Sequence, residues 1–232
     1  MNKFFDPDIH EGVNQLPEVD SKHCAQVLRH KQGDKVLVID GKGGIHTSVL
    51  TKVSKTTCEY EILESKNVTP TQFKTHLIIA PTKNTDRMEW LIEKLCEIGV
   101  DKVTFVATQN SERRKLRLDR LEKKAISAMK QSGNPFLMEL QDLTAFDQII
   151  ESEDSTLKLI AHVDQNHRYI GDLLLPNKEV AILIGPEGDF TKEEVEKAFK
   201  TGFQPVSLGI NTLRTETAGF AACCFVNFIN KV

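Results

Sequence analysis

The sequence predicts a two-domain α/β protein, with a small β-barrel over residues 1–70 and a mostly parallel α/β sheet over residues 71–232. Short apolar strands separated by glycine-containing turns fill the first part, which is the pattern of a small barrel. A polar segment containing Pro70 follows, and after it short apolar strands alternate with amphipathic helices. That alternation is typical of a parallel sheet with helices on both faces.

Composition indicates a globular protein of the cytoplasm. Of the 232 residues, 40% are hydrophobic. No apolar run approaches the ~20 residues of a membrane span, and the start MNKFFDPDIHEG lacks the apolar core of a signal peptide. None of the five cysteines belongs to a CxxC pair or lies near a histidine at metal-ligand spacing. We therefore expect a cytoplasmic protein with reduced thiols, no membrane segment and no bound metal.

Charge is distributed unevenly along the chain. The net charge is −3, but residues 111–130 carry 8 Lys and Arg against 3 Asp and Glu, whereas residues 131–232 carry 8 against 15. A local basic strip on an acidic protein can bind phosphates. The alternative is that the strip is only a solvated helix face.

The N-terminal strands are expected over residues 35–40, 44–50 and 57–63. The first two flank a glycine-rich turn, and TCEYEIL in the third alternates polar and apolar residues. Residues 21–30 are expected to form a helix with Val27 and Leu28 inward and Arg29 outward. The polar residues 64–74 are the expected linker.

The C-terminal elements follow from hydrophobic periodicity and capping residues. A helix that starts at Asn84 or Thr85 carries one apolar face and ends at Gly99. Thr191 and Glu194 form a capping box for a later helix. The other expected helices cover residues 116–132, 144–151 and 215–230, and the expected strands cover residues 76–80, 102–107, 136–140, 157–162, 180–184 and 205–208.

Two of these strands, at residues 180–184 and 205–208, run directly into glycine-containing loops. The first loop reads Gly-Pro-Glu-Gly over residues 185–188, and the second reads GINTLR over residues 209–214. Ligands of open α/β sheets bind beyond the carboxyl ends of the strands. The two loops therefore form a candidate ligand site, although two ordinary connections between strands and helices would give the same pattern.

The segments LIGPEGDFTKEEVEKAFKTGF and VSLGINTLRTETA resemble the C-terminal signature of the RsmE family. These are SPOUT-class (trefoil-knot) methyltransferases, which methylate N3 of a uridine in bacterial 16S rRNA. The N-terminal stretch HCAQVLR with the later GD and DGKG, and the segment PTKNTDRMEWLIEKLCEIGV, resemble the same family. The resemblance covers nearly the whole chain, and the two C-terminal loops are its most specific parts.

The resemblance implies a C-terminal SPOUT α/β trefoil-knot domain over residues 71–232 and a PUA-like β-barrel that binds RNA over residues 1–70. It also implies a homodimer through the knot region, with each active site completed by the partner subunit. The methyl donor would be S-adenosylmethionine (SAM), and the substrate would be 16S rRNA or the small ribosomal subunit. The implied cofactor-binding residues lie in the two loops and at the ends of the strands before them: Ile184, Gly185, Pro186, Glu187, Gly188, Leu208, Gly209, Ile210, Asn211 and Leu213.

Methylation at uridine N3 requires that the base loses a proton, so the site must align N3 and stabilise the resulting anion. The resemblance places Arg214 in the active-site loop, where a guanidinium near uracil O2 or O4 would favour the anion. Glu216 is the second catalytic candidate, either accepting the proton or orienting Arg214. Alternatively, Glu216 has only a structural role: its carboxylate lies at the start of the last helix, where negative charge complements the helix dipole. Leu208 and Leu213 are alternatively simple core residues.

The implied RNA contacts are basic residues from both parts of the chain. Arg29 belongs to the N-terminal stretch that resembles the family, and a surface arginine is its alternative interpretation. The remaining candidates are Lys83, Arg113, Arg114, Lys115 and Arg117.

The sequence departs from the family pattern at two positions. Asp189 stands where a glycine is common, and it adds a carboxylate beside the cofactor loop. Asn211 stands where an arginine is common, which weakens the expectation of an RNA contact there. Two other functions stay open: a SPOUT methyltransferase acting on another RNA or at a ribose 2′-oxygen, and a non-catalytic RNA-binding protein of ribosome assembly.

Overall fold

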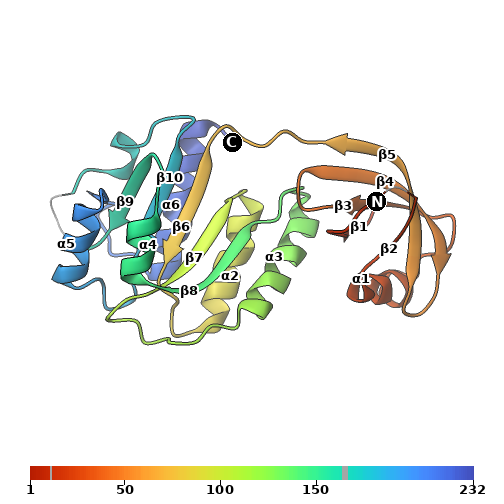
Figure 1. Ribbon diagram of the computed structural model, residues 1–232, viewed down its shortest axis with the longest axis horizontal. Helices are drawn as coiled ribbons and strands as arrows, with labels where there is room; N and C mark the ends of the chain where they lie inside the picture. The colour runs from red at the N-terminus through yellow and green to blue at the C-terminus, as the bar shows by residue number, and fades with distance from the viewer. Residues whose placement is uncertain (11, 164–166) are drawn as a thin grey trace. The chain divides into compact units, whose positions relative to one another are not determined.

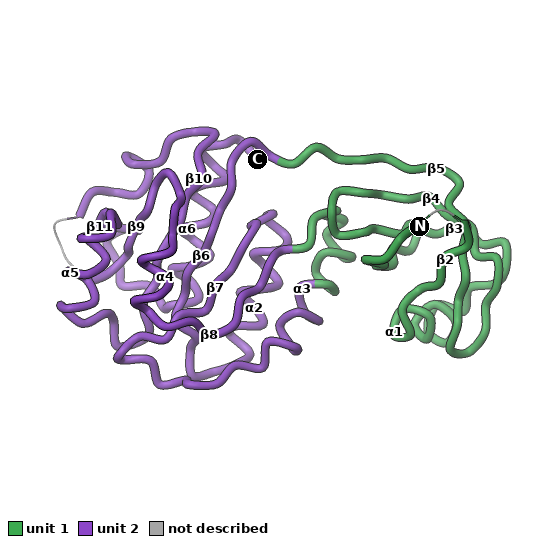
Figure 2. The backbone as a smooth tube through the Cα atoms, in the orientation of Figure 1, with its two compact units in different colours: residues 1–70, 126–137 green, residues 71–125, 138–232 purple. Residues whose placement is uncertain are grey.

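The structure is a computed structural model that describes residues 1–10, 12–163 and 167–232. The chain divides into two compact units (Figure 2). Unit 1 comprises residues 1–70 and 126–137, and unit 2 comprises residues 71–125 and 138–232. Helix α3, Leu118–Ser132, therefore begins in unit 2 and ends in unit 1.

Unit 1 is built on a five-stranded sheet with the order β1-β3-β4-β5-β2. β1 pairs with β3 in parallel, and the remaining pairs are antiparallel. β3, β4 and β5 are the three strands expected from the sequence, whereas β1 and β2 are too short to carry a clear alternation. The strands are β1 Lys3–Phe5, β2 Val13–Gln15, β3 Lys35–Ile39, β4 Gly44–Val53 and β5 Cys58–Asn67.

The apolar core of unit 1 is formed by buried side chains of the strands, of the residue after β2 and of the helical segment that follows it. The buried Tyr60 hydroxyl donates a hydrogen bond to Asp6 (2.7 Å), so this polar group has a partner inside the core. From α3, Met129 packs against Phe5 and Ile39. The main cluster contains Phe4, Leu16, Cys24, Val36, Val38, Leu50, Cys58 and Tyr60.

The helical segment of unit 1 differs from the expected helix. It consists of α1, Glu18–Lys22, followed by the π-helical turn η1, His23–Val27. The expectation that Val27 and Leu28 face inward was wrong, because their exposed fractions are 66% and 36%. The N–H of Leu28 donates to the His23 carbonyl five residues earlier (3.0 Å), which widens the turn and leaves Cys24 as its buried residue.

Unit 2 contains a six-stranded, all-parallel sheet with the order β11-β9-β10-β6-β7-β8 (Figure 1). All six expected strands are present. The strand expected over residues 102–107 has those same bounds, whereas the others have shifted ends, and the one expected over residues 136–140 begins three residues later. The strands are β6 Lys74–Ile79, β7 Lys102–Ala107, β8 Glu139–Ala145, β9 Leu157–Ala161, β10 Glu179–Ile184 and β11 Gln204–Val206. The helices are α2 Thr85–Glu97, α4 Phe146–Ser152, the short 3-10 helix η2 Ile170–Asp172, α5 Lys192–Lys200 and α6 Thr215–Asn230.

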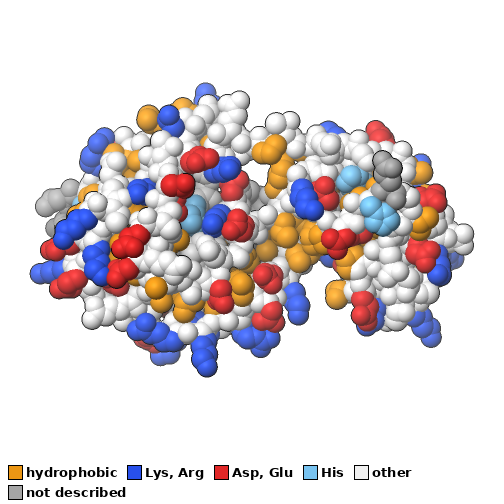
Figure 3. Space-filling view, viewed as in Figure 1, with side chains coloured by type: hydrophobic (Ala, Val, Ile, Leu, Met, Phe, Trp, Pro, Cys, Tyr) orange, Lys and Arg blue, Asp and Glu red, His pale blue; other side chains and the backbone are white. Residues whose placement is uncertain are grey.

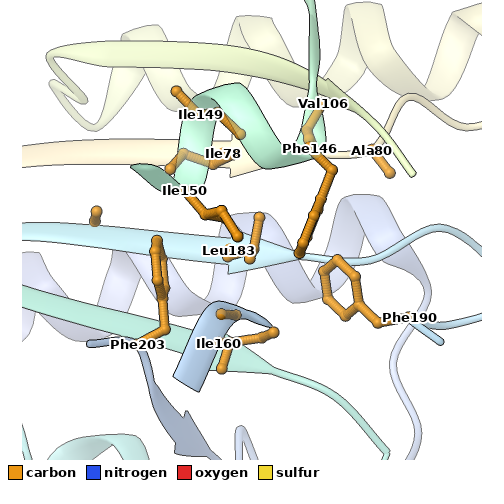
Figure 4. Close-up of a cluster of buried hydrophobic side chains, with 12 residues drawn as sticks. Ile78, Ala80, Val106, Phe146, Ile149, Ile150, Ile160, Leu183, Phe190 and Phe203 are labelled. Carbon is orange, nitrogen blue, oxygen red and sulfur yellow. The ribbon is translucent and has the colours of Figure 1, made fainter. Parts of the chain in front are cut away.

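Helices cover both faces of this sheet. On one face, side chains of α4 and α5 pack on β6, β9 and β10, and Figure 4 shows Phe146, Ile150 and Leu183 within this cluster. On the other face, α6 approaches β6 closely at Gly219, where an added Cβ would lie 2.9 Å from Ile79 Cδ1. The capping residues Asn84 and Thr191 accept helix N–H hydrogen bonds as expected. This two-sided covering explains why the strands read as continuous apolar runs.

Charged side chains of both signs are interspersed over unit 2 on the face drawn in Figure 3. On that face, basic side chains do not form a continuous field. All five cysteines are free thiols, four of them buried. Within the described ranges, no helix has the length and apolar character needed to cross a membrane.

Candidate active site

Three neighbouring strands of unit 2 end together at one edge of the sheet. In the parallel ladders, Ala161 at the end of β9 pairs with both Ile184 of β10 and Val206 of β11. The loops that follow these strands consequently start side by side. This edge is where an open α/β sheet exposes backbone groups to a ligand.

The loops line an open cavity of about 780 Å³. Its floor is apolar, with Ile184 from β10 and Ala218 from α6, and its rim carries Glu187 and Arg214. A Cβ added to Gly209 (φ +140°) would meet no atom within 4 Å, so the absent side chain leaves its backbone bare along the cavity. A flat, partly apolar ligand with polar ends fits this combination of walls.

The loop after β10 is a tight turn that is held in place by a side chain from another segment of the chain. The N–H of Asp189 donates to the Pro186 carbonyl (3.0 Å), which closes the turn. Asn110, from the segment after β7, donates its side-chain amide to the carbonyls of Gly188 (3.1 Å) and Asp189 (3.0 Å). A Cβ at Gly185 would lie 3.0 Å from the Phe190 ring, so a larger residue would displace that ring.

The loop after β11 is more exposed and leads into α6. The Ser207 hydroxyl donates to the Gly209 carbonyl (3.2 Å), and the backbone of Ser207 pairs with the segment around Tyr169. Ile210 projects fully into solvent. Arg214 is the N-cap residue of α6, and its carbonyl accepts the N–H of Ala218 (2.8 Å). The exposed Arg214 side chain is thus presented at the cavity by a helix start.

The structure brings nine of the ten cofactor candidates to this cavity. Gly188 is the exception, because it faces Asn110 outside the lining. One wall was missed from the sequence. It consists of Ala161, the last residue of β9, and of His162, Val163, His167 and Tyr169, which come after β9. These residues lie at or beyond the end of an expected strand, as the two glycine loops do, so their position could have indicated them.

The two catalytic candidates have different surroundings. Arg214 is exposed and lines the cavity. Glu216 is 7% exposed, does not line the cavity, and lies 3.5 Å from the Arg87 Nε of α2. Its second oxygen, Oε2, has no hydrogen-bond partner among the described residues. The Arg87 pairing was not foreseen, because nothing in the sequence aligns α2 with the start of α6.

The basic candidates in unit 2 make different contacts. Half-buried Arg113 donates to the backbone carbonyls of Thr82 (3.1 Å) and Lys83 (2.5 Å). Lys83 pairs with Glu112 (3.0 Å), which raises the pKa of the lysine through a hydrogen bond and charge attraction. Arg117 pairs with Asp119 (3.0 Å), Arg114 donates to the Gln109 carbonyl (3.2 Å), and Lys115 is exposed.

In unit 1, the remaining candidate, Arg29, is exposed and adopts a left-handed backbone conformation (φ 58°) directly after the π-helical turn. Its side chain is thereby available to solvent.

A second, polar cavity of about 410 Å³ lies at the opposite edge of the unit 2 sheet, where the strands begin. His76 is hydrogen-bonded there to Glu153 (2.7 Å) and to the hydroxyl of Thr104 (2.7 Å). Burial raises the pKa of the Glu153 carboxyl, but hydrogen bonds from His76 and Ser155 outweigh this effect and lower the pKa to about 2. In the part of the chain that the structure describes, no three His, Cys, Asp or Glu residues cluster as metal ligands do.

Comparison with known proteins identifies both units. A family model described as an RNA methyltransferase domain matches residues 69–227, and one described as an RNA methyltransferase PUA domain matches residues 16–63. A crystal structure of a "probable rRNA-methyltransferase" from Porphyromonas gingivalis is 38% identical, with a TM-score of 0.93 over 100% of this chain and 99% of that one.

Two further relatives carry a more specific name. The ribosomal RNA small subunit methyltransferase E from Neisseria gonorrhoeae, bound to S-adenosyl methionine, is 30% identical with a TM-score of 0.90, covering 99% of this chain and 98% of that one. The protein of the same name from Synechocystis sp. is 28% identical over 94% of this chain and 73% of its own length.

The fold and the matched domains define an RNA methyltransferase: a SPOUT-type parallel-sheet catalytic domain with an N-terminal PUA domain. This confirms the fold class expected from the sequence. The chain belongs to the ribosomal RNA small subunit methyltransferase E (RsmE) family, as its two C-terminal loops indicated.

Proposed function

We propose that this protein transfers a methyl group from SAM to N3 of a specific uridine in the 16S rRNA of the small ribosomal subunit. The observation that carries the proposal is the cavity at the ends of β9, β10 and β11, with bare glycine backbone in its wall and Arg214 at its rim. The relative from Neisseria gonorrhoeae, of the same family, was solved with SAM bound.

The residues of the cavity fit SAM. An adenine ring needs apolar surfaces and backbone hydrogen bonds, which Ile184, Leu208 and the backbone around Gly209 offer. Glu187 is exposed at the rim, where its carboxylate can accept a hydrogen bond from a ribose hydroxyl. Together with Gly185, Pro186, Ile210, Asn211 and Leu213, these residues make up our proposed cofactor site. When bound, SAM supplies an activated methyl group, so the protein's own task is to prepare the base.

Arg214 is our proposed catalytic residue. Uracil N3 is protonated in neutral uridine, and the anion formed on its deprotonation places charge on O2 and O4. A guanidinium at the cavity rim would stabilise that charge with paired N–H donors, which lowers the pKa of N3 in the bound base. Arg214 itself does not accept the proton, because arginine stays protonated in proteins.

We assign Glu216 a supporting role near Arg214. Its carboxylate lies in the first turn of α6, where negative charge is favourable, and it pairs with Arg87. This pairing fixes the start of the helix that presents Arg214. We do not assign the group that accepts the proton from uridine N3 to any side chain of the cavity.

RNA binding is proposed for both parts of the chain. We assign residues 1–70 to an RNA-binding domain and residues 71–232 to the catalytic domain. Arg29, Arg114, Lys115 and Arg117 are exposed and suited to phosphate contacts, as is Lys83 once Glu112 is displaced. Arg113 already donates hydrogen bonds from its Nε and one terminal nitrogen to the carbonyls of Thr82 and Lys83. We therefore propose that it holds residues 82–83 in place and does not contact RNA.

A homodimer through the outer face of α6 is part of the proposal. Phe220, Cys224 and Phe228 recur every four residues and form one apolar stripe, with Phe228 78% exposed. Trp90 of α2 extends the stripe by an edge-to-face contact with Phe220 (5.5 Å between ring centroids). A second copy of the same helix face would bury this surface.

We place the activity in the cytoplasm, where small subunits are assembled.

The test is methyl transfer from labelled SAM to small ribosomal subunits that lack the modification, followed by mass mapping of the methylated nucleoside. Label on a uridine base at N3 in 16S rRNA is the expected result. Label at a ribose 2′-oxygen, or on another RNA supplied in the same assay, would refute the proposed substrate and keep the enzyme class.

A calorimetric titration with SAM addresses the remaining alternative. A protein that only assists ribosome assembly would give no heat of SAM binding and would transfer no methyl group. We expect saturable binding by the native protein without added RNA.

A further inference from the structure

Asp189 has an unusual backbone conformation and an engaged side chain. Its φ of 58° lies in the left-handed region, which favours glycine and tolerates asparagine and aspartate. One carboxylate oxygen, Oδ1, accepts the N–H of Phe190 (2.8 Å). The other, Oδ2, accepts the N–H of Val163 (2.9 Å). A glycine would adopt the same backbone conformation but would provide neither hydrogen bond.

The hydrogen bond to Val163 joins two separate walls of the cofactor cavity. Asp189 belongs to the loop after β10, whereas Val163 follows β9, and both residues line the cavity. Val163 is 69% exposed, so packing of its side chain does little to hold its backbone in place. The carboxylate therefore supplies a specific connection that apolar contacts do not replace.

The turn that carries Asp189 does not need this side chain for its own shape. The N–H of Asp189 already donates to Pro186, and Asn110 already holds the carbonyls of Gly188 and Asp189. These contacts involve backbone atoms of residues 186–189, which any residue that tolerates the conformation would keep. The distinct contribution of the carboxylate is thus directed to the neighbouring segment.

We propose that Asp189 is a positioning residue for cofactor binding: its carboxylate holds the segment His162–Val163 against the Gly-Pro-Glu-Gly loop and so preorganises one wall of the cavity. The inference rests on the proposed function, because the ligand in question is SAM. A wall that is already ordered lowers the entropy cost of binding. A hydrogen bond to a charged acceptor is strong enough to hold such a segment.

The decisive variant is Asp189→Gly, because it removes the carboxylate and keeps the left-handed backbone. We expect its Kd for SAM, measured by calorimetry, to rise about tenfold, in line with the loss of one hydrogen bond to a charged group. The KM for SAM should rise by about the same factor, with kcat at saturating SAM changed less than about threefold. Asp189→Asn keeps one acceptor oxygen and should give an intermediate Kd.

Asn177→Gly is the matched control. Asn177 is another non-glycine residue with a φ of 58°, and it lies outside the cavity lining. This substitution introduces the same glycine into the same backbone conformation, so it reports any general effect of chain flexibility. We expect its Kd for SAM to stay within about twofold of the native value.

Hydrogen exchange gives a readout that needs no cofactor. The Val163 amide should exchange faster in Asp189→Gly than in the native protein, and at the native rate in Asn177→Gly. Native SAM affinity in Asp189→Gly, or an unchanged Val163 exchange rate, would overturn the inference while leaving the proposed function intact. Absence of SAM binding by the native protein would instead reject the proposed function, and this inference with it.

Discussion

His76 Nδ1 lies 2.7 Å from Glu153 Oε2, and the two side chains are only 11% and 6% exposed. This buried pair joins the start of β6 to the segment after α4, at the sheet edge opposite the cavity lined by the glycine loops. The Thr104 hydroxyl links the pair to Gln141, so β7 and β8 belong to the same hydrogen-bonded group. The beginnings of three adjacent strands are therefore tied together by polar contacts.

The pair of His76 and Glu153 should make the free energy of unfolding depend on pH in the acid range. The pKa of the Glu153 carboxyl is lowered from 4.5 to about 2, so the stabilisation by this carboxylate is present above about pH 4.5 and is lost as the pH falls towards 2. The shift corresponds to at most about 3 kcal/mol. In denaturant unfolding, Glu153→Gln should be destabilised at pH 7, and the difference from the native protein should shrink by pH 3.

Glu179→Gln is the control for this comparison, because Glu179 forms an exposed, long pair with Lys74 (3.8 Å) near the same cavity. Such pairs contribute little to stability. A destabilisation by Glu153→Gln that stays constant between pH 7 and pH 3 would contradict the assignment.

Arg214 should affect catalysis more than cofactor binding. Arg214→Ala removes the proposed stabilisation of the uridinate anion, and we expect kcat to fall by about 10²-fold while Kd for SAM changes little. Arg214→Lys keeps the charge without the paired N–H donors, so its kcat should lie between those of the native protein and Arg214→Ala. Single-turnover methyl transfer and SAM calorimetry measure the two quantities separately. Full activity of Arg214→Ala would remove this residue from the chemistry.

Arg113 and Lys115 should behave differently, although both belong to the basic strip. Lys115→Ala should weaken RNA binding and reduce the slope of log K against log salt by about 1, as expected for one lost phosphate contact. Arg113→Ala should instead lower thermal stability, because its guanidinium holds the carbonyls of Thr82 and Lys83. Filter binding across a salt series, with thermal melts, distinguishes the roles. Identical profiles for both variants would argue against them.

Phe228→Glu should dissociate the proposed dimer. A carboxylate in the apolar stripe of α6 would be buried without a partner in the dimer, which costs several kcal/mol. Light scattering coupled to gel filtration should give a monomer mass for this variant. Leu175→Glu is the control, since Leu175 is another exposed apolar residue (59%) of unit 2 outside the stripe. A native protein that elutes as a monomer would refute the dimer directly.

Gly219→Val should destabilise unit 2. The new side chain would meet Ile79 and Leu77, whose nearest atoms lie 2.9 Å and 3.1 Å from the position of an added Cβ. Overpacking of this kind costs about 1–3 kcal/mol. Ala221→Val, on the same helix at a partly buried position, controls for the helix propensity of valine. Equal melting temperatures of the two variants would indicate that α6 can move away from β6.

Much of unit 2 could be predicted because its signals are local. The apolar runs of β6, β7 and β10 and the caps at Asn84 and Thr191 each lie within one element. The two glycine-containing loops could be found for the same reason, and they line the cavity that we propose binds the cofactor. The wall at His162 and Val163 was missed because no glycine or charge pattern distinguishes it, although its place after a strand was visible.

The sequence did not reveal one contact between distant segments or the type of one helical turn. Nothing in the sequence indicated that Glu216 pairs with Arg87, which lies 129 positions earlier in the chain. The inward orientation of Val27 and Leu28 failed because an α-helical period was assumed for a π-helical turn. Sequence periodicity reports which residues share a face only when the helix type is known.

The central position of β6 has a consequence for synthesis of the protein on the ribosome. β7 borders β6 on one side and follows it closely, but β10 borders it on the other side, with Glu179 paired to Lys74, 105 positions earlier. A nascent chain that has emerged only through α4 thus carries an open strand edge, which is a site of aggregation. This edge is covered, and the cavity at the ends of β9, β10 and β11 is formed, only when the last quarter of the chain has left the exit tunnel.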